Sequence, residues 1–396
     1  MGWRYIATKL NGDGTETVLD WDLPIVQPSF TDELSGAGGM SGTIAPEIAR
    51  LRVDGEPIFV PWSTALYAEA DGIIRHGSIL SDITEEGPVL KLTGVGFSAY
   101  LKGQCYGGEW VKTRIDPALA VTEIWRYIQA QPKGNIGLKV PTFKTDKLIG
   151  NEKNESSYSS TNTTNSVSTN GDTGVVTTTP RTSTNSGTNT TLKPYELAWW
   201  KTFDLGNEFI KLAAETPFDF TITHAWEGEK ITHTMDISYP EIKARKDNFR
   251  FVVGENLFSV PSIDYDGDQY ASHVIVVGAG EGRKAVRGEE RKTPTRLYRS
   301  VGMSDSGIES ASKAKAQAVK EIAARLGDVD ITEIVMVDHP HAPLGSVAPG
   351  DEIFIQTTDG WTDRLELWCR VLAVTINPDA GAAQLTVTRT EKAGLA

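Results

Sequence analysis

Short segments that alternate apolar and polar residues make up most of the first hundred positions. Leu90 and Leu92, for example, alternate with Lys91 and Thr93, the pattern of a strand with one buried and one solvated face. Asn and Gly residues at 11–14 accept the positive φ of a tight hairpin turn. The pattern predicts a small barrel or sandwich, with strands over 5–10, 15–19, 58–60, 66–70, 73–80 and 89–94.

A helical period replaces this alternation after residue 115. Asp116 and Pro117 predict a helix start, because aspartate caps free N–H groups and proline loses no hydrogen bond at the first helical position. The apolar side of this helix consists of Val121, Ile124, Trp125 and Ile128. A second helix over 206–215, with Phe209, Leu212 and Ala213 on one side, is followed by strands over 218–224 and 231–239.

Beyond residue 247 the pattern predicts strands again, interrupted by one long helix. Ser306 and Glu309 have the spacing of a capping box, and Gly327 is a helix end. The apolar side of this helix is Ala311, Ala314, Ala318, Ile322 and Leu326. The remaining strands are predicted over 251–257, 263–265, 273–278, 334–337, 352–356, 365–376 and 384–388.

These elements predict an α+β, mainly β fold in which two small β-barrel-like modules flank mixed α/β regions. The expected domains are an N-terminal β-barrel-like domain (1–103), an α/β middle domain (104–245), and a C-terminal α/β plus β-barrel-like domain (246–396). The middle domain carries a polar insertion over 151–193: of the 41 residues from 151 to 191, 28 are Ser, Thr or Asn. Such a segment has little apolar surface to offset its ordering entropy. A turn at 171–174 favours an extended insertion, ordered by other subunits, over a loosely packed loop.

Charge and motifs narrow the function. The chain has 39 Lys and Arg against 52 Asp and Glu, a net charge of −13, which argues against a dedicated nucleic-acid binder. Gly278, Gly280 and Gly282 resemble a dinucleotide fingerprint, but Arg283 occupies the third glycine position and no helix start follows. We expect no cofactor.

No metal or catalytic site is expected either. The acidic turn at 264–268 lacks EF-hand spacing, His339 and His341 have no further nearby ligands, and Cys105 and Cys369 are isolated, as buried thiols would be. Hydrolase motifs such as G-x-S-x-G and H-E-x-x-H are absent from the sequence. Neither a secretory signal nor an apolar run long enough to span a membrane is recognised.

Two clusters of residues are candidate interfaces. The segment from 283 to 299 contains seven basic residues and only two glutamates. This excess of positive charge indicates either a solvated loop or a docking loop for an acidic neighbouring subunit. An aromatic pair beside Tyr195 and Phe203 indicates a core or a subunit interface more than a sugar platform. The residues selected are Arg283, Lys284, Arg287, Arg291, Lys292, Trp199 and Trp200.

The order of several segments carries a family resemblance. Gly254-Glu255-Asn256-Leu257 leads through 263–265 to a strand ending at 278–280, and the helix over 306–326 precedes a β module around 349–351 and Trp361. Segments 116–128 and 205–218 fit the middle region. This order resembles the siphophage minor tail protein family that forms the tail hub, related to baseplate hubs of contractile tails and type VI-like injection machines.

The resemblance implies a structural protein of the virion tail tip, assembled in the host cytoplasm. It implies a homotrimer that adapts the sixfold tail tube and its distal tail protein to a threefold tip. Such a hub closes the lumen, contacts the tape measure protein and lets DNA pass without binding it specifically. The long insertion departs from the family pattern. The alternatives are a carbohydrate-binding tail adhesin and, with less support, a cell-wall hydrolase.

Overall fold

The computed structural model describes residues 2–53, 55–169, 176–216, 218–259, 270–294, 297–325, 330–358 and 365–390, together with 261, 263, 264 and 267. Strands dominate these residues, with three longer helices among them. The predicted α+β, mainly β fold is confirmed. The expected turn at 171–174 and Trp361 lie outside the described residues.

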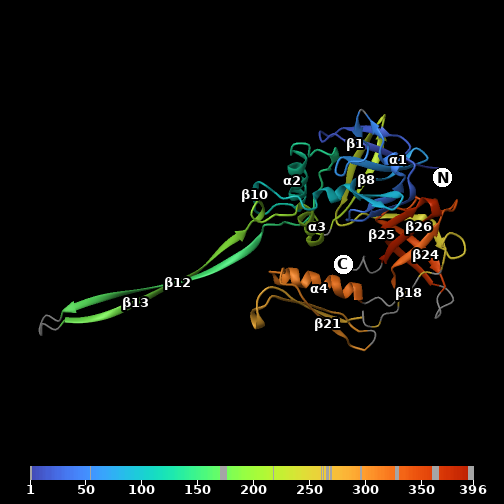
Figure 1. Ribbon diagram of the computed structural model, residues 1–396. Helices are drawn as coiled ribbons and strands as arrows, with labels where there is room; N and C mark the ends of the chain where they lie inside the picture. The colour runs from blue at the N-terminus through green and yellow to red at the C-terminus, as the bar shows by residue number, and fades with distance from the viewer. Residues whose placement is uncertain are drawn as a thin grey trace.

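One large sheet joins the two ends of the chain (Figure 1). Its main path runs β17-β24-β25-β3-β4-β9-β8-β7-β1-β2, and β26 pairs with both β25 and β23. β25 pairs antiparallel with β3, with Val374 opposite Asp32, so the two predicted β modules share hydrogen bonds. The strands are β1 (Trp3–Leu10), β2 (Glu16–Asp20), β3 (Val26–Glu33), β4 (Gly39–Ile44), β7 (Thr64–Ala70), β8 (Ile73–Glu86), β9 (Val89–Gly96), β17 (Ala244–Val252), β23 (Glu333–Val337), β24 (Asp351–Thr357), β25 (Leu365–Asn377) and β26 (Ala382–Arg389).

The N-terminal strands are buried more completely than their pattern predicts. Every residue of β7 is buried, because Leu66 and Ala68 face the core shared with the C-terminal strands while Ala65 and Tyr67 face the middle region. The expectation of one wet face is therefore wrong for this strand. A polar Thr at its start is tolerated because the Thr64 hydroxyl donates to the Ile58 carbonyl at 2.6 Å.

Residues 58–60 were predicted as a strand and form none. Ile58 is buried, and its N–H donates to the Leu51 carbonyl at 3.3 Å. The Val60 carbonyl then accepts from the N–H groups of Ser63 and Thr64, which closes a turn. The apolar residues of this segment therefore reflect burial in the core and not a strand. The short elements before it are α1 (Pro46–Ala49), β5 (Arg52–Val53) and β6 (Glu56–Pro57).

The middle region follows its sequence pattern closely. The Asp116 carboxylate accepts the Ala118 N–H at 2.9 Å and caps α2 (Pro117–Gln129). Trp125 of α2 packs edge-on against Phe209 of α3 (Leu205–Glu215), with ring centroids 6.2 Å apart. Around these helices lie η1 (Phe97–Leu101), β10 (Glu109–Lys112), β11 (Leu138–Lys139), β14 (Tyr195–Ala198), β15 (Asp219–Glu227) and β16 (Lys230–Ser238).

A small α/β unit with its own core lies within the C-terminal third. Helix α4 (Ala311–Arg325) packs on β19 (His273–Val277) and β20 (Arg287–Arg291), and Ala314, Ala318 and Ile322 are fully buried there. The predicted capping box at Ser306 is wrong, since the helix begins after Ser310, whose hydroxyl accepts the Lys313 N–H at 3.4 Å. The other short elements are β18 (Ile263–Asp264), η2 (Gly282–Lys284), β21 (Ser300–Ser304), β22 (Asp330–Ile331) and η3 (Pro378–Ala380).

Candidate functional site

The polar insertion forms a long two-stranded hairpin, which we call the arm. Its strands, β12 (Glu152–Thr169) and β13 (Val176–Lys193), pair antiparallel without a bulge, from Glu152 opposite Lys193 to Thr169 opposite Val176. Eighteen residues at a rise of about 3.3 Å give a length of roughly 60 Å. Figure 1 shows the arm leading away from the rest of the chain. The expectation of an extended insertion is confirmed, whereas its contact with other subunits stays a prediction.

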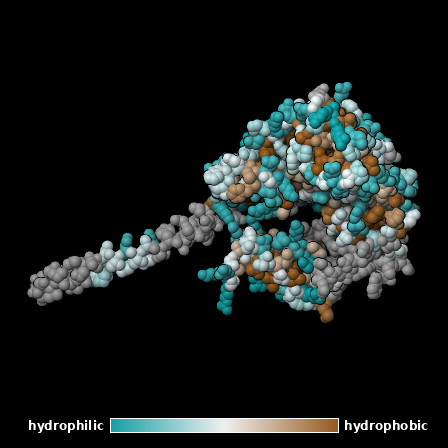
Figure 2. Space-filling view, viewed as in Figure 1, coloured by the Kyte–Doolittle hydropathy of each residue, from teal (hydrophilic) through white to brown (hydrophobic). Residues whose placement is uncertain are grey.

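The central part of the arm, where the structure describes side chains, is polar and exposed. Residues 160–164 and 179–186 are all exposed, and the coloured part of the arm in Figure 2 ranges from white to teal. Its charged residues are Glu152, Lys153, Glu155, Asp172, Arg181 and Lys193, so the arm has no net charge.

The predicted aromatic pair stands at the base of the arm. β13 ends at Lys193, β14 pairs with β10, and a tight turn then carries Trp199 and Trp200. This turn is held rigidly, because the Trp199 N–H donates to the Gly108 carbonyl at 3.0 Å and the Thr202 N–H to the Ala198 carbonyl at 2.8 Å. The indole rings therefore stand on a fixed scaffold.

These aromatic side chains face solvent. Trp199 is 62% exposed, Trp200 45% and Phe203 64%. The two indole rings are nearly perpendicular, at 88°, so they do not form one flat surface on which a sugar ring would stack. Exposed apolar clusters are typical of interaction sites, and the interpretation of these residues as an interface stays a prediction. Nearby, Cys105 is exposed and not buried as expected, and its thiol donates to the Phe203 carbonyl at 3.3 Å.

The structure divides the predicted basic cluster. Arg287 pairs with Glu289 at 2.8 Å, Lys292 with Glu290 at 4.0 Å, and Arg291 lies over the Tyr298 ring at 6.0 Å. Arg283 and Lys284, on the turn η2, are exposed and form no ion pair with any part of the chain that is described. These two cations are therefore free to meet an acidic partner.

The two predicted clusters belong to different parts of the fold, the aromatic pair to the middle region and the basic residues to the α/β unit. No hydrogen bond or ion pair within the described ranges joins them directly. One ion pair that the sequence did not predict joins the base of the arm to the α/β unit. Lys193 of β13 bonds Glu309, which lies just before α4, at 2.5 Å. Residues so far apart in the chain give no sequence signal for this contact.

A chain of polar groups that the sequence did not reveal is buried between the first strands and β15–β16. The Glu16 carboxylate accepts hydrogen bonds from the Tyr67 hydroxyl and the Thr8 hydroxyl, at 2.7 and 2.8 Å. It also lies 2.7 Å from Nε2 of His233. The Nδ1 atoms of His233 and His224 are 2.8 Å apart, so the imidazole pair shares a single proton there.

Burial lowers the pKa of His224 well below its usual range, with His233 adding to the shift. The unfolded chain, with a histidine pKa of about 6.5, binds a proton that the folded chain excludes. The contribution of His224 to the free energy of unfolding is therefore expected to be fully present above pH ~6.5 and to be lost progressively as the pH drops below that value. Urea unfolding at pH 7.5 and 5.0 measures this loss. It should shrink in His224→Asn, and an equal loss in both proteins would contradict the assignment.

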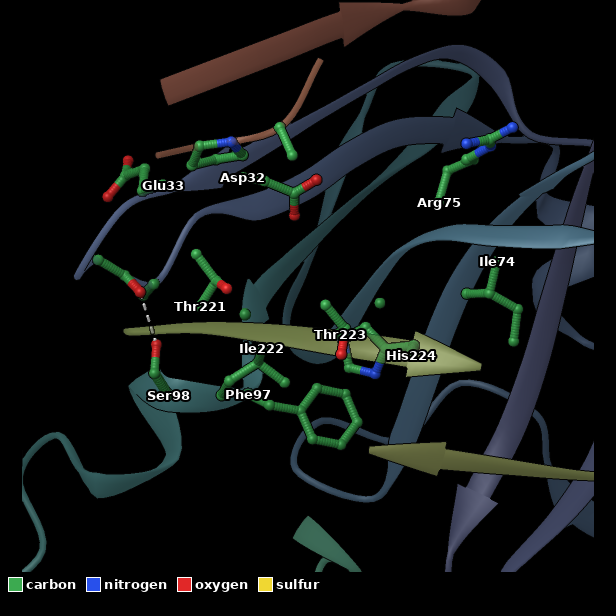
Figure 3. A pocket seen from close by; sticks show the side chains of 16 residues that line it. Asp32, Glu33, Ile74, Arg75, Phe97, Ser98, Thr221, Ile222, Thr223 and His224 are labelled. Atoms are coloured by element: carbon green, nitrogen blue, oxygen red, sulfur yellow. Dashed lines mark hydrogen bonds between the residues drawn. The ribbon is translucent and has the colours of Figure 1, made fainter. Parts of the chain in front are cut away.

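His224 also borders a pocket of about 280 Å³ (Figure 3). Asp32 and Arg75 line it from the large sheet and Thr221 and Thr223 from β15. Ser98 donates its hydroxyl to the Gly36 carbonyl at 2.9 Å while His224 bonds His233, so the two form no nucleophile–base pair. Asp32 is bound to Nδ1 of His76 at 2.7 Å. The pocket is therefore a polar seam between strands and assembles no recognisable catalytic group.

Candidate metal ligands were also compared across the described part of the chain. Within the described ranges, no three His, Cys, Asp or Glu side chains are grouped as a metal site, and no helix is long and apolar enough to cross a membrane.

Comparison with known proteins gives a result at the level of structure alone. No family model matches the sequence, and no curated protein matches it. The 43 kDa tail protein of prophage MuSo2 from Shewanella oneidensis is similar with a TM-score of 0.56 and 11% identity, over 99% of both chains. A tail protein from Neisseria meningitidis MC58 has a TM-score of 0.52 and 13% identity, over 98% of this chain and 97% of that one. The chain thus has the fold of phage tail proteins, as the resemblance predicted.

Proposed function

We propose that this chain is a structural hub of a phage tail tip and works as a homotrimer. In this role it adapts the sixfold tail tube and its distal tail protein to a threefold tip, meets the end of the tape measure protein and closes the lumen. The observation that supports the proposal is the shared fold, which extends over 99% of this chain and of the MuSo2 tail protein.

Electrostatics is compatible with DNA passage. Each copy carries a net charge of −13, so a ring of copies repels the phosphate backbone and does not retain it. DNA then slides through the hub without a specific site. The free cations Arg283 and Lys284 and the exposed Trp199 and Trp200 are proposed to contact neighbouring subunits or tail proteins.

Sedimentation velocity of the purified chain, together with antibody labelling of virions in electron microscopy, tests this function. We expect a trimer in solution and label at the tail tip. A monomer at all concentrations, with no label at the tip, would contradict the hub. Binding of host wall polysaccharides on a glycan array would favour the adhesin alternative, and release of muropeptides from host walls would favour the hydrolase.

Deleting residues 151–191 is expected to leave the body folded, because the arm contributes little apolar burial. Gly150 lies against Tyr195, so the shortened chain closes without strain. The midpoint of thermal unfolding should stay within about 2 °C of the wild type, while incorporation into tails or infectivity falls. A large loss of thermal stability in the isolated chain would show that the arm supports the fold of the body.

A further inference from the structure

The two faces of the arm differ in composition. In the antiparallel register, Thr161 lies opposite Thr184 and Thr163 opposite Thr182, and the hydroxyl oxygens of the second pair are 3.5 Å apart. Because alternate positions of a strand share a face, these four residues lie together, and we call them the threonine face. Apolar residues (Val167, Val176 and Leu192) fall at positions of the same parity, as do Asn165 and, at the base of the arm, Lys153 and Glu155.

The opposite face is more polar. The rungs between those of the threonine face pair Ser160 with Asn185, Asn162 with Ser183 and Thr164 with Arg181. Serine, asparagine and arginine suit a solvated surface, whereas the methyl groups of threonine suit a packed one. The arm therefore has the two-sided pattern of a strand pair with one inner and one outer face, although its composition is polar throughout.

Residues 161, 163, 182 and 184 are all exposed, so no described part of the single chain covers the threonine face. An isolated two-stranded hairpin is at best marginally stable in water, and both outer edges of the arm offer unpaired backbone groups. A partner that covers the face and pairs with the edges would remove both problems.

The charges at the base of the arm favour further copies of the chain as that partner. Arms without net charge approach each other without repulsion. If β12 of one copy lies beside β13 of the next at the same height, position 152 comes level with a neighbouring Lys193, which also bonds Glu309 of its own chain. Pairing β12 with β12 at the same height would instead bring glutamates together.

Size also fits. A closed tube of few strands has a narrow interior, which small side chains fill, and threonine hydroxyls satisfy one another as Thr163 and Thr182 do. Closure by rotational symmetry removes every edge. A partner with an apolar groove would have required an apolar arm.

We propose that three arms of the homotrimer close into one tube, with β12 of each arm bonded to β13 of the next and the threonine face inside. This inference rests on the proposed trimeric hub. The tube would extend from the subunits for the length of the arm, as a rigid projection that no single chain could hold.

A matched pair of double variants tests the tube. Thr161→Glu with Thr184→Glu places carboxylates on the threonine face, and Ser160→Glu with Asn185→Glu places the same charges one rung away on the opposite face. The readout is the rate of tryptic cleavage after Arg181, measured on the full chain together with its sedimentation. Cleavage follows the fraction of open arms.

In a trimer we expect slow cleavage in the wild type and in the Ser160/Asn185 variant. Carboxylates enclosed in the middle of the tube would be buried without partners, so the Thr161/Thr184 variant should be cleaved at least about tenfold faster. Equal rates in both variants of a trimeric chain would overturn the tube and leave the hub standing. A monomeric chain cleaved equally fast in every form would overturn both.

Discussion

Replacing Arg370 with alanine is expected to lower the free energy of unfolding by about 3–5 kcal/mol. Arg370 lies on β25 and is 8% exposed. Its guanidinium bonds the Asp219 carboxylate, donates to the Ile242 carbonyl at 2.9 Å and pairs with Glu241 at 3.3 Å. Without this cation, two carboxylates of low exposure lose their shared partner, and Glu241 is left with its pair to Lys243. The contact between the C-terminal strands and β15 would weaken.

Chemical denaturation of the variant and of Lys139→Ala measures this effect. Lys139 forms an ion pair with Glu227 in which both side chains are well exposed, at 62% and 71%, so its loss should change stability by less than about 0.5 kcal/mol. Similar small losses in the two variants would show that the Arg370 pairs are solvated and carry little energy.

A second large effect is expected from Gly288→Ala in β20. A Cβ atom there would lie 2.2 Å from the backbone of Ala314 and Lys315 in α4, too close for any rotamer to relieve. The helix must move off the sheet, and the small core of the α/β unit opens. We expect a destabilisation of about 3 kcal/mol, seen as faster hydrogen exchange in α4.

Gly302→Ala in β21 is the control for this substitution. β20 and β21 flank the same strand, β19, but a Cβ at position 302 meets no atom within 4 Å. Its hydrogen exchange in α4 should match the wild type. If both alanine variants behave alike, close packing of α4 on β20 is not what holds the unit together.

Local rules predicted the helices and hairpins well. The start of α2 follows from Asp116 and Pro117, and the hairpin β1–β2 follows from the Asn–Gly turn at 11–14. Both depend on residues adjacent in the chain. The rule failed at α4, where the capping-box spacing placed the start at Ser306 and the helix begins after Ser310.

The candidate site was predictable only in part. The extended arm was expected from composition, whereas Trp199 and Trp200 were assigned to a core or a subunit interface, and only the structure shows that they are exposed. The separation of Arg283 and Lys284 from their paired neighbours was not, because each pairing depends on strand register. The buried link from Glu16 through His233 to His224 joins residues more than 200 positions apart, which no sequence spacing reveals.

The sequence by itself determined the elements of this protein, its acidic charge, and the polar arm with its small residues. These properties depend on each residue and its near neighbours. Only the tertiary structure decided that β3 and β25 pair, that β7 is buried on both faces, and that the arm stands free with one face of threonines. Such features depend on which distant segments meet, and that choice is made by packing across the whole chain.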